Sequence, residues 1–247
     1  MEFHVLPTRT GGAAENMALD FLLLQRYPAP TAVRCRHYEW RSPAFTFGFG
    51  QKAAWVRGQL PPDERFDLCR RPTGGGIVDH RHDWTYALVI PREHGLWEAR
   101  AAESYRVVHE CLAQALRELG QPAVVKTKAD QPEPGGLGGL VPTPPVSSGP
   151  GICFQRAELY DVIHERLGEK IAGAAQKRNK HGLLFQGSIW KPAVGAVDWE
   201  AFGSRFVAAL AGATGIPASL TPWPDLNEDE VAGLIEQYSQ PEWLDYR

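Results

Sequence analysis

The chain has 247 residues, with 26 Lys and Arg against 29 Asp and Glu, a formal net charge of −3, and 43% hydrophobic residues. This charge balance gives no global basic field that would favour binding to nucleic acid or an anionic membrane. No apolar run approaches the roughly 18 residues that a membrane-spanning helix needs. The length suits a soluble globular protein of one large or two small domains with a substantial core.

Strands and helices follow one another irregularly along the chain. Runs of β-branched and aromatic residues predict strands, and apolar residues at three- and four-residue spacing predict helices. The expected strands cover residues 3–6, 32–40, 44–48, a short run ending at 69, 84–90, 123–127, 159–164, 170–178 and 183–190. The expected helices cover residues 13–27, 52–60, 103–119, 199–213 and 228–238. Hairpin-like spacing between strands, interrupted by long helices, predicts an α+β fold rather than alternating βαβ units.

A glycine-rich segment lies between two expected strands. Residues 70–80 read Arg-Arg-Pro-Thr-Gly-Gly-Gly-Ile-Val-Asp-His. Three successive glycines lose much backbone freedom on folding, but they leave a main chain without Cβ atoms. A ligand can then lie directly on backbone N–H groups. We therefore expect a ligand-binding loop here, and the alternative is a tight connection between strands.

The segment at residues 130–151 contains six prolines and six glycines. This composition is incompatible with regular secondary structure, and the segment is long for a simple connection. We expect a mobile loop at the edge of a site, within a single domain that covers residues 1–247. The alternative is a linker between two domains.

Four cysteines occur, and they form neither a CxxC pair nor a zinc-binding spacing. With no signal-peptide pattern at the N-terminus, they predict a cytoplasmic protein with reduced thiols and no metal site. Cys111 falls on the apolar stripe of a helix and Cys69 in a strand, so both are expected to be buried. Cys153, in the loop region, is the candidate nucleophile.

Several segments together resemble the lipoate/octanoate/biotin protein ligase and transferase family. They are residues 16–20, 48–51, 70–80 and 170–178, in family order. The glycine-rich segment combined with the downstream Lys-Ile-Ala-Gly-x-Ala is more specific than either half. The Gly-Arg-rich loop of biotin ligases is absent, which favours the lipoyl/octanoyl branch. The resemblance implies a class II biotin/lipoyl ligase-like catalytic domain, with mixed and antiparallel sheets flanked by helices.

Two chemistries compete within that branch. Cysteine-dependent, LipM-type octanoyltransferases carry a Cys-Phe pair ahead of the lysine, and Cys153 and Phe154 occupy that place here. This resemblance implies octanoyl transfer from acyl carrier protein, through a cysteine thioester, to a lysine of a lipoyl domain or the glycine-cleavage H protein, with no cofactor. The alternative is a lipoate-protein ligase that uses ATP and Mg²⁺. A third possibility is a catalytically silent relative that binds lipoyl domains or acyl groups.

The resemblance also implies roles for individual residues. Cys153 would accept the acyl group, and Lys170 would lower the pKa of that thiol, hold the acyl carbonyl and shuttle a proton. The glycine N–H groups would add hydrogen bonds, His80 would brace the loop, and the acyl chain would lie against Ala172 and Ala174. The implied substrate-binding residues are Arg71, Thr73, Gly74, Gly75, Gly76, His80, Asp161, Ala172, Gly173 and Ala174.

Two features leave alternatives open. Arg70 and Arg71 suit phosphate or adenylate contacts, carrier-protein contacts, or solvated surface charges. Gln186 stands before Gly187-Ser188 where many family members have histidine. This departure leaves the finer chemistry of the pocket, and its acyl specificity, open.

Overall fold

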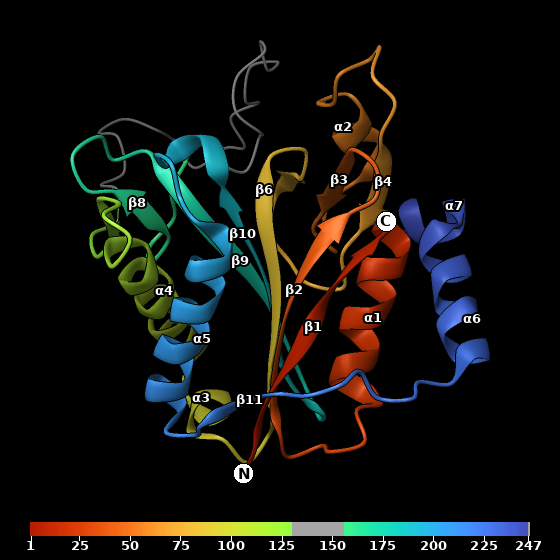
Figure 1. The fold of residues 1–247 in the computed structure, drawn as a ribbon. Coiled ribbons are helices and arrows are strands. Elements are labelled where there is room, and N and C mark those ends of the chain that lie inside the picture. Colours follow the sequence, from red (N-terminus) through yellow and green to blue (C-terminus); the bar gives the residue numbers. More distant parts are fainter. Residues whose placement is uncertain (130–155, 247) are drawn as a thin grey trace.

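A twisted, mixed β-sheet runs through the centre of the molecule in the computed structural model (Figure 1), which describes residues 1–129 and 156–246. Within these residues the sheet has eight strands, in the order β11-β1-β2-β6-β10-β9-β8-β7. The strands in that order are β11 (Ala218–Leu220), β1 (Phe3–Gly11), β2 (Val33–Trp40), β6 (Asp83–Ile90), β10 (Gly182–Trp190), β9 (Lys170–Asn179), β8 (Val162–His164) and β7 (Ala123–Val125). β1 pairs in parallel with β11 and β2, and the remaining pairs are antiparallel.

A smaller sheet carries the glycine-rich segment. Within the described residues it has three strands in the order β4-β3-β5, with β3 parallel to β4 and antiparallel to β5. Their bounds are β3 (Ala44–Phe47), β4 (Asp67–Arg70) and β5 (Ile77–Asp79). We call residues 71–76, between β4 and β5, the glycine loop. The short helix α2 (Ala53–Arg57) contributes Ala53 and Val56 to the core of this unit.

Helices cover both faces of the large sheet (Figure 1). One layer contains α4 (Ala101–Arg117) and α5 (Trp199–Thr214), and the other contains α1 (Ala13–Gln25) and α6 (Glu228–Ser239). Two separate hydrophobic cores result, one under each layer. The short elements are α3 (Gly95–Glu98), the 3₁₀ turn η2 (Lys191–Ala193) and α7 (Pro241–Leu244). None of the helices in the described parts of the chain combines the length and apolarity needed to cross a bilayer.

Local sequence signals explain where the key elements end. Gly120, with a φ of 77°, takes the left-handed conformation just after α4, and Gly168, with a φ of 71°, does the same in the turn from β8 to β9. Glycine adopts this conformation at little steric cost. Asp198 begins α5 by accepting hydrogen bonds from the backbone N–H groups of Glu200 and Ala201.

The predicted α+β fold, its long helices and its principal strands are confirmed. β5 and β11, of three residues each, were not predicted. β8 begins at Val162 rather than at 159, because the chain before it makes a turn at Tyr160, whose φ is 70°. The predicted loop at 130–151, and Cys153 with Phe154, lie outside the described residues.

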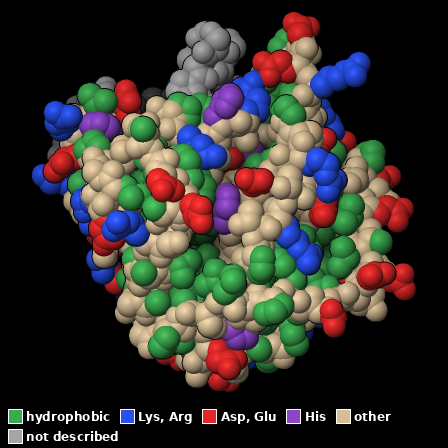
Figure 2. All heavy atoms as spheres, in the orientation of Figure 1, with side chains coloured by type: hydrophobic (Ala, Val, Ile, Leu, Met, Phe, Trp, Pro, Cys, Tyr) green, Lys and Arg blue, Asp and Glu red, His purple; other side chains and the backbone are tan. Residues whose placement is uncertain are grey.

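Charged side chains of both signs are interspersed over the face drawn in Figure 2, while hydrophobic side chains gather in its lower centre. An apolar groove lies between the large sheet and α5, lined by residues that include Val5, Cys35, Trp84 and Phe206. This groove shares no lining residue with the cavity described next.

Candidate active site

A cavity of about 240 Å³ lies where the glycine loop meets α1, α4 and the strands β9 and β10. Its size falls somewhat below the roughly 300–1,000 Å³ of pockets for drug-sized ligands, so it suits a small ligand. Much of its wall is backbone or small side chain, from Gly75 and Gly76 on one side and from Gly173, Ala174 and Ala175 of β9 on another.

Lys170, the first residue of β9, forms an ion pair on the cavity wall. Its Nζ lies 2.7 Å from Oδ2 of Asp161, and the two side chains are 11% and 1% exposed. The backbone N–H of Glu158 also donates to Oδ2 of Asp161, at 2.7 Å. The backbone of Gly173 makes room for this pair, since a Cβ there would lie 2.8 Å from Nζ of Lys170.

Tyr105 of α4 completes the surroundings of Asp161. Its hydroxyl donates to Oδ1 of Asp161 at 2.6 Å and accepts from the backbone N–H of Ala174 at 3.0 Å. Burial and the neighbouring Asp161 raise the pKa of Tyr105 well above its ordinary value. The phenol therefore stays protonated and remains a donor to the carboxylate.

The glycine loop is shaped by a buried arginine. Nη2 of Arg71 donates to the carbonyls of Gly74 at 2.8 Å and Gly76 at 2.9 Å. Gly75 has a φ of 87°, which favours glycine. Gly48 allows the loop to approach, because a Cβ at Gly48 would lie only 2.0 Å from the carbonyl oxygen of Gly75.

His80 braces this loop only through intermediates. Nδ1 of His80 lies 2.7 Å from Oδ2 of Asp83, and Nε2 lies 2.7 Å from the hydroxyl of Thr46. Nη1 of Arg71 donates to that same hydroxyl at 2.9 Å. The carboxylate of Asp83 also accepts hydrogen bonds from Thr85 and Ser188. Arg71 therefore makes the direct contacts with the loop carbonyls, and His80 is connected to the loop through Thr46 and Arg71.

Arg70 contacts the protein's own backbone rather than solvent. It is fully buried, and its guanidinium donates to backbone carbonyls of Phe49, Gln51, Trp243 and Leu244. Arg70 therefore ties the turn after β3 to α7 near the end of the chain. Neither Arg70 nor Arg71 is a solvated surface charge, because both face carbonyl oxygens inside the protein.

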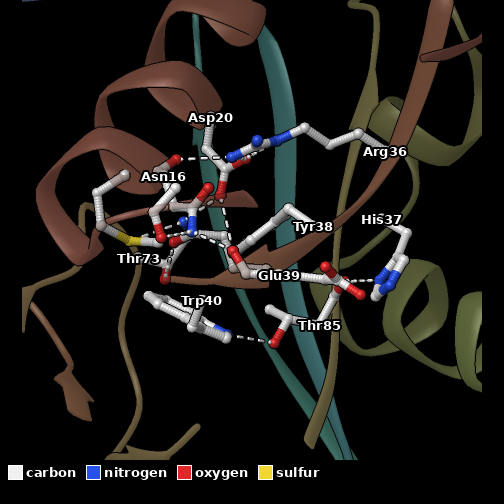
Figure 3. Close-up of polar contacts among 12 residues, drawn as sticks. Asn16, Asp20, Arg36, His37, Tyr38, Glu39, Trp40, Thr73 and Thr85 are labelled. Carbon is white, nitrogen blue, oxygen red and sulfur yellow. Dashed lines mark hydrogen bonds and ion pairs between the residues drawn. The ribbon is translucent and has the colours of Figure 1, made fainter. Parts of the chain in front are cut away.

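Gln186 links the glycine loop to α1. Its amide nitrogen donates to Oδ2 of Asp20 at 2.7 Å, and its amide oxygen accepts from the hydroxyl of Thr73 at 2.7 Å. Arg36 and Tyr38 of β2 also point to Asp20 and donate to its carboxylate (Figure 3). Burial raises the pKa of Asp20, and its donors act in the opposite direction, led by the charge of Arg36. The neutral glutamine thus joins the glycine loop to α1 at the wall of the cavity.

The structure brings together most of the sequence-predicted site residues but not all. Thr73 and Gly74 are not among the described residues that line the cavity. The Thr73 hydroxyl donates a hydrogen bond to Gln186, and the Gly74 carbonyl accepts one from Arg71. Ala172 is likewise not among the residues that line the cavity, and it is fully buried in the core under α4 and α5. Those that line the cavity are Arg71, Gly75, Gly76, His80, Asp161, Lys170, Gly173 and Ala174.

Sequence reasoning missed other residues of the site. Tyr105 lies on the expected helix at residues 103–119, and the spacing that predicts this helix gives no sign of its hydrogen bond to Asp161, 56 positions away. No sequence pattern marks Thr46 or Ser188 as a site residue either, since each lies in a strand with no other distinguishing feature.

The three cysteines within the described residues are buried, as was expected for Cys69 and Cys111. Burial raises the pKa of Cys35 and Cys69 to about 12 and that of Cys111 to about 11. These thiols therefore lack the thiolate character of a nucleophile. Within residues 1–129 and 156–246, no group of three or more His, Cys, Asp and Glu side chains is placed to hold a metal ion.

The fold is that of the lipoate-protein ligases. Lipoate-protein ligase A bound with ATP superposes with a TM-score of 0.71 at 17% identity, covering 99% of this chain and 98% of that one. A bipartite lipoate protein ligase from Thermoplasma acidophilum superposes with a TM-score of 0.70 at 18% identity, covering 98% and 96%. The predicted class II ligase-like architecture is thereby confirmed.

The chain belongs to the lipoyl protein ligase A/B catalytic domain family, whose model matches residues 12–191. It is 33% identical over 184 residues to the octanoyltransferase LipM of Bacillus cereus, covering 71% of this chain and 60% of the relative. It is 32% identical over 180 residues to the octanoyltransferase LipM of Bacillus subtilis, with the same coverage. The chain thus spans about 60% of the length of these relatives.

Proposed function

We propose that this protein is an octanoyltransferase that moves an octanoyl group from acyl carrier protein, through a thioester on Cys153, to a lysine of a lipoyl domain or glycine-cleavage H protein. The observation that carries the proposal is the Lys170–Asp161 ion pair on the wall of a small cavity, opposite the glycine loop. The relatives named as octanoyltransferases support the same chemistry.

The cavity suits an aliphatic acyl chain. Two polar side chains of its lining are bonded to carboxylates outside that lining: Gln186 donates to Asp20, and Ser188 donates to Asp83. Around Gly173 and Ala174 the wall offers backbone and methyl groups. At about 0.8 kcal/mol for each buried methylene, seven aliphatic carbons contribute roughly 5 kcal/mol, enough to favour octanoyl over short acyl groups.

The chemistry proceeds in two balanced steps. In the first, the Cys153 thiolate attacks the thioester carbonyl of the donor, a new C–S bond forms, and the carrier thiolate leaves and takes up a proton. In the second, the amine of the acceptor lysine attacks the Cys153 thioester, an amide forms, and the Cys153 thiolate leaves. The first step exchanges one thioester for another and the second runs downhill to an amide, so the route needs neither ATP nor a metal.

Lys170 has three roles in this proposal. Its ammonium, held by Asp161, stabilises the thiolate of Cys153 and the negative charge that develops on the acyl oxygen in each tetrahedral intermediate. In the second step it relays the proton released by the attacking amine. Gly75 and Gly76 line the cavity, and their backbone N–H groups would add hydrogen bonds to the acyl carbonyl.

The test is the intact mass of the protein after incubation with octanoyl-acyl carrier protein. We expect a gain of about 126 Da, one octanoyl group in place of a hydrogen, mapped to Cys153 and discharged by a lipoyl domain. Cys153→Ser should abolish transfer to the acceptor lysine, while Cys111→Ser, at a buried thiol, should retain it. Full turnover by Cys153→Ser would overturn the proposal. Formation of octanoyl-adenylate from octanoate, ATP and Mg²⁺ would instead indicate a ligase.

A further inference from the structure

A left-handed turn precedes the carboxylate that pairs with Lys170. Tyr160 has a φ of 70°, and among the described residues it is the single non-glycine residue with a positive φ. A side chain is disfavoured in this conformation, so the surrounding structure must hold it in place. The next residue is Asp161, whose position decides where the Lys170 ammonium lies.

His109 of α4 holds this turn from inside the protein. Its Nδ1 lies 2.6 Å from the carbonyl oxygen of Tyr160, and the histidine is fully buried. The partner strand holds the other side: the backbone N–H of Tyr160 donates to the carbonyl of Lys126 at 2.8 Å, and the N–H of Lys126 donates to the carbonyl of Asp161 at 2.9 Å. The turn is thus fixed between a helix and the end of β7.

The protonation state of His109 follows from its partners. A carbonyl oxygen only accepts, so Nδ1 carries the proton, and Nε2 has no hydrogen-bond partner among the described residues. Burial lowers the pKa of His109 to about 4, with Lys170 acting in the same direction and Asp161 and the Tyr160 hydrogen bond opposing it. The ring is therefore neutral near pH 7 and does not compete with Lys170 for the charge of Asp161.

Tyr105 stands one turn before His109 on the same face of α4. The two rings are in contact, with centroids 4.1 Å apart. Tyr105 holds the side chain of Asp161, and His109 holds the backbone just before it. Residues at this four-residue spacing are neighbours on a helix surface, so one rigid element fixes the carboxylate at two points.

We propose that Tyr105 and His109 are a pair of positioning residues for Lys170, which fix Asp161 and, through it, the ammonium on the cavity wall. This inference rests on the proposed function, because the pair positions the lysine that would take part in octanoyl transfer. The placement of Lys170 by the pair is measurable whether or not the protein transfers octanoyl groups.

The test compares two amide substitutions at one position. His109→Asn places an N–H donor close to where Nδ1 stood, whereas His109→Gln carries its amide one methylene further, away from the Tyr160 carbonyl. The full-length variants are acetylated with a limiting amount of N-hydroxysuccinimidyl acetate, and the modification of Lys170 is measured by peptide mass spectrometry against exposed Lys52. An amine held in a buried ion pair is shielded from the reagent, so an amine that loses its carboxylate partner reacts faster.

We expect Lys170 acetylation in His109→Gln to rise about threefold to tenfold over the unsubstituted protein, and His109→Asn to stay within about twofold. Tyr105→Phe, which keeps the ring and removes the hydroxyl donor, should also raise it, and it decides the question if the His109 variants do not fold. Val108→Ala controls for loss of packing in the same helix, and it should leave Lys170 reactivity unchanged.

Two results would overturn the inference. One is an unchanged Lys170 reactivity in folded His109→Gln or in Tyr105→Phe. The other is an equal rise in Val108→Ala, which would show that any weakening of α4 has the same effect. An absence of octanoyl transfer by the unsubstituted protein would count against the proposed function alone, because the acetylation pattern does not depend on it.

Discussion

The ammonium of Lys170 reaches the carboxylate of Asp161, 2.7 Å away, across the bare backbone of Gly173. A Cβ at Gly173 would lie 2.8 Å from Nζ of Lys170 and 3.0 Å from Oδ1 of Asp161. Lys170 and Gly173 of the lysine motif therefore form one steric unit with Asp161, which lies outside that motif, and the ion pair occupies the space that a side chain at Gly173 would need.

Gly173→Ala should lower the transfer activity while leaving the free energy of unfolding almost unchanged. The atoms in the way are the ends of side chains, which can swing aside, so we expect the free energy of unfolding to change by less than about 1 kcal/mol. The displaced ammonium should nevertheless lower kcat/KM for octanoyl transfer by about tenfold or more. Gly233→Ala, in open space on α6, is the control and should keep full activity. Equal activities of the two variants would contradict this account of Gly173.

Gly48→Ala should damage the fold as well as the site. Its Cβ would lie 2.0 Å from the carbonyl oxygen of Gly75 and 2.7 Å from the carbonyl carbon of Gly74, and backbone atoms cannot swing aside. We expect a loss of about 1–3 kcal/mol in the free energy of unfolding in urea, together with loss of transfer. Gly50→Ala, with no atom within 4 Å of the added methyl group, should be close to neutral.

Gln186→Leu tests the junction between the glycine loop and α1. The substitution removes the acceptor of the Thr73 hydroxyl and one donor of the buried Asp20. Leaving these groups with fewer partners should cost about 1–3 kcal/mol in the free energy of unfolding.

A double-mutant cycle supplies the control for Gln186. Thr73→Val and Gln186→Leu should show a coupling energy of at least about 0.5 kcal/mol, because the two side chains share a hydrogen bond. Strictly additive effects would mean that this bond contributes nothing to stability.

His109 should make the protein sensitive to mild acid. Its pKa is about 4 in the folded state against an ordinary value of 6.5, because the ring is buried, and the unfolded chain therefore binds a proton that the folded chain does not. The contribution of His109 is complete above pH 6.5 and is lost as the pH falls toward 4. The loss amounts to roughly 3 kcal/mol.

This pH dependence is measurable by urea unfolding between pH 7.5 and 4. His109→Asn should reduce the slope of stability against pH in that window, since its side chain does not titrate. The charged groups that act on His109 in the folded state, Asp161 and Lys170, remain in the variant. An unchanged slope would show that other groups dominate the acid response.

The sequence predicted more of the fold than of the site's interior. The helices expected at residues 103–119 and 199–213 match α4 and α5 within a few residues at each end. Arg71 lies on the cavity wall, and its guanidinium also holds the carbonyls of the glycine loop, which the sequence did not indicate. A run of residues shows that an arginine is present, but the direction of its side chain depends on which carbonyl oxygens the fold brings to it.

The sequence alone determined the succession of the long helices and principal strands, the glycine loop and the lysine motif of β9, because local propensity and short spacings carry that information. The tertiary structure decided which residues serve Lys170: Tyr105 meets Asp161 from 56 positions away. It likewise decided that Gln186 joins Asp20 across 166 positions. Such pairs depend on the register of the sheet strands and on the packing of helices against them, and no local pattern of residues encodes either one.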